Sequence, residues 1–141
     1  MKDKYFIDTN IIIYSFDKSN SKKQKTSEEI ISDALYEHKG CISYQVIQEF
    51  INVATQKFKT PLTTNDCTDY LINVLEPLCE VLSSIELYKD ALEIKDSWQY
   101  SFYDSLIISS ALRANCNILY TEDLQHKQRI RDLVIINPFL S

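Results

Sequence analysis

Five short apolar runs recur along the chain, and helical segments separate them. Within those segments, apolar residues return every three or four positions, as in an amphipathic helix. Strands that alternate with helices in this way usually build a mainly parallel sheet with helices on both faces. The runs are residues 4–8 (KYFID), 41–43 (CIS), 79–82 (CEVL), 118–121 (ILYT) and 133–136 (LVII). The pattern therefore predicts an α/β fold with a mainly parallel sheet.

The segment between the first two runs carries signals for the start and end of a helix. Residues 18–25 are polar and basic, and we expect them to form a loop. Thr26 and Glu29 have the spacing of a capping box, which marks a helix start. Gly40 follows the helical pattern and is expected to end this helix as a C-terminal glycine.

Length, glycine content and charge limit the classes of function. A chain of 141 residues suits one compact domain, which we expect to span residues 1–141. The single glycine, Gly40, excludes a Walker loop and a G-x-G-x-x-G fingerprint, because both need several glycines. The net charge of −5 disfavours binding to nucleic acid through bulk charge. A nuclease remains open, since carboxylates that bind a metal count as negative until the ion is bound.

The cysteines and the N-terminus set further expectations. No Cys-x-x-Cys pair occurs and the two histidines lack zinc-site spacing, so buried free thiols are expected. The N-terminal stretch MKDKYFID lacks the features of a signal peptide. No apolar run approaches the ~20 residues of a membrane span. We therefore expect a cytoplasmic protein without a membrane segment.

Three of the twenty acidic residues differ from the others, which follow solvated helical patterns. Asp8 ends the first run, Asp104 opens the most apolar helical segment, and Asp123 follows the fourth run. Sites in parallel α/β sheets gather at the carboxyl ends of strands and at adjoining helix N-termini, so Asp8 and Asp123 are expected near one edge, which Asp104 could join. Each also has a plainer interpretation as a helix cap. Glu49 lies on a polar helical stripe with Gln45, and its spacing alone does not indicate a site.

Carboxylates gathered at one edge repel one another and raise each other's pKa. Hard divalent cations relieve this repulsion, and Mg²⁺ and Mn²⁺ prefer oxygen ligands. A water bound to such an ion can attack a phosphodiester while the ion stabilises the leaving oxygen. The acidic set therefore favours metal-dependent hydrolysis over cysteine–histidine catalysis, for which neither histidine is well placed.

Four motifs, taken in order, resemble the PIN domain family. They are FIDTN around Asp8, SYQVIQEF with Glu49, YDSLIISSA with Asp104 and LYTEDL with Asp123. Their order and separation resemble the VapC-like branch, the ribonuclease toxins of type II toxin–antitoxin pairs, over nearly the whole chain. The resemblance implies a three-layer sandwich with a mainly parallel five-stranded sheet. It also implies an endoribonuclease that depends on Mg²⁺ or Mn²⁺.

The resemblance assigns roles to single residues. The acidic residues that match the metal site are Asp8, Glu49, Asp104 and Asp123. Thr9 and Asn10 match a small polar pair that supports the first aspartate, and Thr121 matches a hydroxyl that orients the site. The motif position favours Asp123 over its neighbour Glu122 as the residue that faces the metal, but both stay open. One departure is Lys127, which stands where the family often has glycine.

The resemblance further implies an RNA substrate, a homodimer, and an antitoxin that blocks the acidic site with a basic side chain. Two basic clusters are candidate phosphate contacts, or else solvated charges. They are Lys22, Lys23 and Lys25, and Lys127, Arg129 and Arg131.

Three other functions fit the sequence less well. The main alternative is a catalytically silent PIN-like domain that acts as a protein- or RNA-binding module. A haloacid dehalogenase-type phosphatase is disfavoured because its motif needs an acid at the position of Asn10, which cannot serve as a general acid. A phosphoacceptor signalling domain is disfavoured because Tyr44, not an acceptor aspartate, follows the run 41–43.

Overall fold

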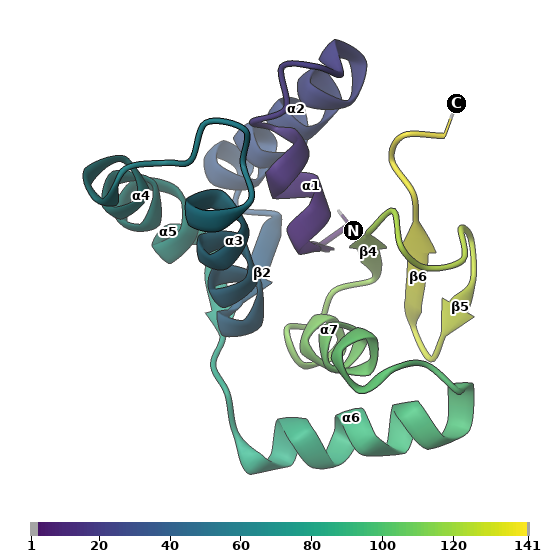
Figure 1. Ribbon diagram of the computed structural model, residues 1–141. Helices are drawn as coiled ribbons and strands as arrows, with labels where there is room; N and C mark the ends of the chain where they lie inside the picture. Colours follow the sequence, from purple (N-terminus) through teal and green to yellow (C-terminus); the bar gives the residue numbers. More distant parts are fainter. Residues whose placement is uncertain (1–2, 141) are drawn as a thin grey trace.

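The computed structural model describes residues 3–140, which form a mostly parallel sheet flanked by helices (Figure 1). The strands lie in the order β3-β2-β1-β4-β6-β5. Their bounds are β1 Tyr5–Ile7, β2 Gly40–Ser43, β3 Cys79–Val81, β4 Ile118–Tyr120, β5 Arg129–Ile130 and β6 Leu133–Ile136. The helices are α1 Thr9–Tyr14, α2 Ser21–Glu37, α3 Tyr44–Gln56, α4 Thr64–Tyr70, the π-helix Leu71–Leu75, α5 Glu76–Leu78, α6 Ile85–Trp98 and α7 Phe102–Arg113.

All five predicted strands are present and parallel to one another, which confirms the mainly parallel α/β sheet. The predicted count of five is one too low, because β5 adds an antiparallel edge to β6. β5 contains only two residues, within a polar run that gives no alternating pattern. The sixth strand is therefore an addition at the edge and leaves the order of the parallel strands unchanged.

The centre of the sheet is covered on both faces. Every residue of β1 and β2 is buried, as expected for central parallel strands whose two faces both meet helices. Helix α1 packs on α2 and α3, while α6 packs on α7 (Figure 1). These two groups of helices hold the strands from which the candidate site extends.

Helix α2 begins five residues earlier than the sequence predicts. Asn20 caps it, since its side chain accepts a hydrogen bond from the Lys23 backbone N–H at 3.2 Å. The predicted loop is therefore correct only for residues 18–20, and the predicted start at Thr26 is wrong. The asparagine cap is one of the strongest N-cap signals, and the lysine run that follows it is compatible with a helix.

Gly40 does not end α2, contrary to the prediction. The helix ends at Glu37, and His38 takes the left-handed conformation with φ 56°. Gly40 instead begins β2, where a Cβ atom would lie 2.4 Å from the Ala34 Cβ and 2.6 Å from Tyr5 Cε2. Glycine is thus needed for the close approach of β2 to α2 and β1.

The four cysteines are free, and all but Cys79 are buried, as expected. The sulfur atoms of Cys41 and Cys116 lie 3.5 Å apart in the core. Within residues 3–140, no helix combines the length and apolar character needed to cross a membrane.

Candidate active site

The site begins where β1 and β4 end side by side. The two strands are parallel, with Ile7 opposite Tyr120, so the residues that follow them emerge at the same edge. The backbone N–H of Asp8 still donates to the Tyr120 carbonyl at 3.0 Å. Strand pairing therefore fixes Asp8 next to Thr121.

Both carboxylate oxygens of Asp8 accept hydrogen bonds. Oδ1 accepts from the Thr9 backbone N–H at 2.7 Å, which makes Asp8 the N-cap of α1. Oδ2 accepts from the Thr121 hydroxyl at 2.8 Å. The same hydroxyl oxygen accepts from the backbone N–H of Asp123 at 3.1 Å. Thr121 therefore connects Asp8 to the loop that carries Asp123.

Glu49 joins this group from α3. Its Oε1 accepts a hydrogen bond from the Thr9 hydroxyl at 2.6 Å, and its Oε2 accepts a longer one from Gln45 at 3.4 Å. The Gln45 amide also donates to the Tyr103 carbonyl at 3.2 Å. Gln45 thus ties the first turn of α3 to the first turn of α7, which carries Asp104.

Asp104 lies at the start of α7, as predicted. The Ser101 hydroxyl caps the helix by accepting from the Asp104 backbone N–H at 3.1 Å. The negative charge is favoured there by the helix dipole. Burial, together with the nearby Asp104 carboxylate, raises the pKa of Tyr100. Within residues 3–140, the carboxylates of Asp104 and Asp123 make no side-chain hydrogen bond, unlike those of Asp8 and Glu49.

Burial raises the pKa of Asp8 to about 7. The hydrogen bonds from Thr121 and Thr9 work in the opposite direction, since they favour the charged form. The carboxylates of Asp123 and Glu49 contribute smaller increases to the same pKa. Ionised Asp8 is therefore destabilising at neutral pH unless a cation binds next to it.

Glu122 is held away from this group. Its carboxylate accepts hydrogen bonds from the Tyr14 hydroxyl, at 2.6 Å, and from the Lys23 ammonium. Burial alone would raise the pKa of Glu122, but these partners outweigh it and lower the pKa. Glu122 is thus paired with α1 and α2, while its neighbour Asp123 acts on Asp8.

Several buried polar atoms near this edge make no hydrogen bond within residues 3–140. They include both side-chain polar atoms of Asn10, the Gln45 carbonyl oxygen, and the hydroxyls of Ser43 and Ser105. Asn10 follows β1, Ser43 ends β2, and Ser105 lies beside Asp104. Buried polar groups normally have a partner, so unpaired ones at one edge indicate a place for water or an ion.

The oxygen-rich group suits a hard cation in its chemistry, although its side chains are not gathered into a complete cage. Within the described chain, no three His, Cys, Asp or Glu side chains are placed to hold one metal ion. Mg²⁺ commonly uses only one or two protein carboxylates and keeps several waters. The buried Asp8 carboxylate, with Asp123 and Glu49 acting on it, fits that mode of binding.

Sequence reasoning missed Gln45, Ser43 and Ser105. Gln45 appeared only as part of a polar stripe, yet it is 8 % exposed and links α3 to α7. Its position in the first turn after a buried strand is a signal that would have favoured it. Ser43, the last residue of β2, carries the same signal.

Comparison with known proteins agrees with this architecture. A toxin–antitoxin complex from Klebsiella pneumoniae matches with a TM-score of 0.67 at 14% identity, covering 96% of this chain and 98% of that chain. VapBC2 from Rickettsia felis, bound to a promoter DNA fragment, gives 0.60 at 21% identity, with 93% and 96% covered. Mycobacterium tuberculosis VapC20, a sarcin–ricin loop cleaving toxin, gives 0.59 at 16% identity, with 85% and 90% covered.

At these identities the structural matches show a shared fold. No curated protein sequence matches the chain significantly. The family model of the PIN domain matches residues 5–131, which includes every predicted site residue. The chain therefore belongs to the PIN domain family.

Proposed function

We propose that this protein is a metal-dependent endoribonuclease that hydrolyses RNA phosphodiester bonds as the VapC-like toxin of a type II toxin–antitoxin pair. The observation that carries the proposal is the buried Asp8 carboxylate, held by Thr121 and Thr9 at the carboxyl edge of the sheet. Charge repulsion from Asp123 and Glu49 gives that edge an affinity for cations. We assign residues 1–141 to one such domain.

In this proposal the metal site uses Asp8, Glu49, Asp104 and Asp123, with Mg²⁺ or Mn²⁺ as the cofactor. A bound ion of this kind supplies an activated water and stabilises the leaving oxygen. Thr121 fixes the rotamer of Asp8 and the backbone at Asp123 through its two hydrogen bonds. Thr9 and Gln45 orient Glu49 in the same way. The pairing of Glu122 with Lys23 supports Asp123 as the acid that serves the site.

The unpaired amide of Asn10 gives it a supporting role. Two residues after Asp8, it has one donor group and one acceptor available for a water or a phosphate oxygen at the edge. Asn10 would then position the attacking water or the substrate without carrying charge.

The partners follow from the structural relatives. One relative is a toxin–antitoxin complex, one is VapBC2 bound to a promoter DNA fragment, and one is described as a toxin that cleaves the sarcin–ricin loop. We accordingly propose an RNA substrate, an antitoxin that covers the acidic edge, a homodimer, and a cytoplasmic location. The second candidate is a catalytically silent PIN domain that binds protein or RNA, which the incomplete gathering of the acids favours.

Cleavage of RNA by purified protein separates these two functions. We expect the wild type to cut a structured RNA in millimolar Mg²⁺ or Mn²⁺ and to stop in EDTA. Asp8→Asn and Asp104→Asn should each lose at least about a hundredfold in rate, since each removes a ligand charge. Asp96→Asn, at an exposed position of α6, is the matched control and should retain activity.

Wild-type rates in either site variant would overturn the site assignment. Absence of cleavage by the wild type on several RNA classes, with intact binding of RNA or of a partner, would instead favour the silent module. Circular dichroism spectra of the variants confirm that the fold is retained in each case.

A further inference from the structure

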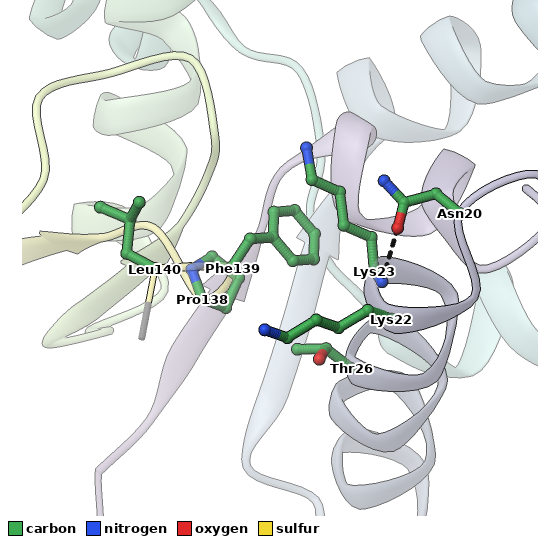
Figure 2. Close-up of a pocket in the computed structure, with 7 residues that line it drawn as sticks. All are labelled: Asn20, Lys22, Lys23, Thr26, Pro138, Phe139 and Leu140. Carbon is green, nitrogen blue, oxygen red and sulfur yellow. Dashed lines mark hydrogen bonds between the residues drawn. The ribbon is translucent and has the colours of Figure 1, made fainter.

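A basic pocket of about 350 Å³ lies beside the acidic edge, between the first turns of α2 and the C-terminal segment after β6 (Figure 2). Lys22, Lys23 and Thr26 line it from α2, and Phe139 lines it from the C-terminal segment. Figure 2 shows the Phe139 ring facing α2 and the Lys22 side chain extending toward the C-terminal segment. The pocket thus presents cations and an aromatic ring within one small space.

The pocket is connected to the acidic edge through a single pair of neighbouring residues. The Lys23 ammonium, which lines the pocket, binds Glu122. Glu122 is followed directly by Asp123, whose charge acts on Asp8. The loop after β4 therefore contacts the pocket through Glu122 and the acidic group through Asp123.

Of the two pocket lysines, Lys23 is paired with Glu122, while the charge of Lys22 is not balanced by a carboxylate within residues 3–140. Lys22 makes no ion pair within residues 3–140, and the first turn of α2 contains no acidic residue. Lysines at a helix N-terminus oppose the helix dipole, so their placement here costs stability. An anion in the pocket would offset that cost and would bind strongly to Lys22.

The Phe139 ring gives the pocket a second property. It packs edge-on against Tyr14, with ring centroids 5.1 Å apart and planes at 77°, which fixes its orientation. The Lys23 ammonium lies 5.1 Å from the Phe139 centroid. Phe139 is only partly buried, so part of its surface remains available. A fixed, accessible ring next to a cation is the combination that binds a base and its phosphate together.

We propose that this pocket binds one nucleotide of the RNA strand next to the cleaved bond, with Lys22 on the phosphate and Phe139 stacked on the base. The inference rests on the proposed ribonuclease function and adds a subsite outside the acidic residues. It also gives Lys22 a use that its neighbour Lys25, which does not line the pocket, does not share.

The test compares Lys22→Gln and Phe139→Leu with Lys89→Gln. Lys89 is exposed on α6, at the other end of the molecule from α2 in Figure 1, and its substitution removes the same charge. Binding of a fluorescent single-stranded RNA is measured by anisotropy in EDTA at several salt concentrations, and cleavage is measured in Mg²⁺. Thermal melting checks each variant, and Lys22→Gln removes no packed side chain.

We expect Lys22→Gln to weaken RNA binding several-fold and to lower the slope of log K against log salt by about 0.7, the value for one phosphate contact on a single strand. Phe139→Leu should weaken binding roughly fivefold or more, as loss of one base stack does. In cleavage assays both variants should raise KM and leave kcat nearly unchanged. Lys89→Gln should behave as the wild type.

Equal RNA affinity and salt slope in Lys22→Gln and Lys89→Gln would overturn the subsite, even if the wild type cleaves RNA. Binding of inorganic phosphate by the wild type together with unchanged RNA affinity in both pocket variants would identify a free-anion site and likewise overturn it. A wild type that does not cleave RNA but shows the expected binding losses would remove the ribonuclease proposal and leave the RNA subsite supported.

Discussion

At the scale of single residues, Asp8 combines burial, two hydrogen bonds and a raised pKa. It is 7 % exposed, it accepts two hydrogen bonds, and burial with two nearby carboxylates raises its pKa to about 7. A carboxylate in an unfolded chain titrates near 4, so the folded protein holds a proton on Asp8 that the unfolded chain has already released. The residue is therefore destabilising when charged and metal-free.

That energetic cost gives a prediction with an unusual sign. Between about pH 4 and pH 7 the folded state binds more protons than the unfolded state, so the stability of the metal-free protein falls as pH rises. Asp8→Asn removes this loss and should increase the free energy of unfolding at pH 8 in EDTA, by at most roughly 4 kcal/mol at about 1.4 kcal/mol per pKa unit. Urea unfolding of the wild type and of Asp8→Asn at pH 8 and pH 5 measures this difference in the free energy of unfolding.

The gain should shrink at pH 5, where the wild-type carboxyl is already largely protonated. Asp96→Asn, at an exposed position of α6, serves as the control and should change stability little at either pH. A loss of stability in Asp8→Asn at pH 8 would mean that the hydrogen bonds to the carboxylate outweigh its burial.

The sequence identified some of these residues and missed others for definable reasons. Asp8, Asp104 and Asp123 stand at the ends of recognisable runs, so strand and helix boundaries point to them. Glu49 needed the family resemblance, because its partner Thr9 is forty residues away in the chain. Gln45 was missed because burial of a polar side chain depends on α7 packing nearby, which local periodicity does not reveal.

At the scale of elements, one polar cluster joins α1, α2 and the loop after β4. Tyr14 and Lys23 both bind Glu122, and the Lys23 ammonium also lies 4.5 Å from the Tyr14 ring centroid. The cluster spans segments about a hundred residues apart in sequence, so it was invisible before the fold was known. The sequence also predicts a loop at Lys23, so the position of this residue in the first turn of α2 is not expected from it.

Glu122→Gln tests what this cluster contributes. The pKa of Glu122 is lowered in the folded protein, so its carboxylate stabilises the fold above the ordinary carboxyl pKa, and this contribution is lost as pH falls through the lowered value. We expect a small decrease in Tm at pH 7 that disappears in acid and weakens with added salt, because the partners are partly solvated.

The matched control is Glu93→Gln, an exposed acid in the middle of α6 that has no ion pair in the part of the chain described. A decrease in Tm for Glu122→Gln that stays constant from pH 7 to pH 4 would show that packing of the side chain, rather than its charge, is what matters.

At the scale of the whole molecule, the order of strands is what creates the candidate site. The alternating pattern predicts parallel strands, but it does not say that β4 lies beside β1. That adjacency places Thr121 against Asp8, and the position of β2 on the other side of β1 places α3 and Glu49 within reach. A protein with net charge −5 can then approach RNA where a cation and the basic pocket offset its acids locally.

A divalent cation bound at the acidic edge should stabilise the fold. If Mn²⁺ binds the native acidic group and not the unfolded chain, it stabilises the fold by about 2.7 kcal/mol when its concentration is a hundred times Kd. The wild type should therefore gain Tm with millimolar Mn²⁺, and the gain should be larger at pH 8 than at pH 5, because protonated Asp8 cannot serve as a ligand. Differential scanning fluorimetry measures both.

Asp8→Asn should be more stable than the wild type in EDTA at pH 8 and should gain little or nothing from Mn²⁺. The difference in Tm between Asp8→Asn and the wild type should thus become smaller, or change sign, as Mn²⁺ is added. Ca²⁺ at equal concentration tests whether the effect is only one of ionic charge, since Ca²⁺ has the same charge but takes more oxygen ligands at longer distances than Mg²⁺. An equal response of wild type and Asp8→Asn to Mn²⁺ would place the ion elsewhere and separate the stability of Asp8 from any role in metal binding.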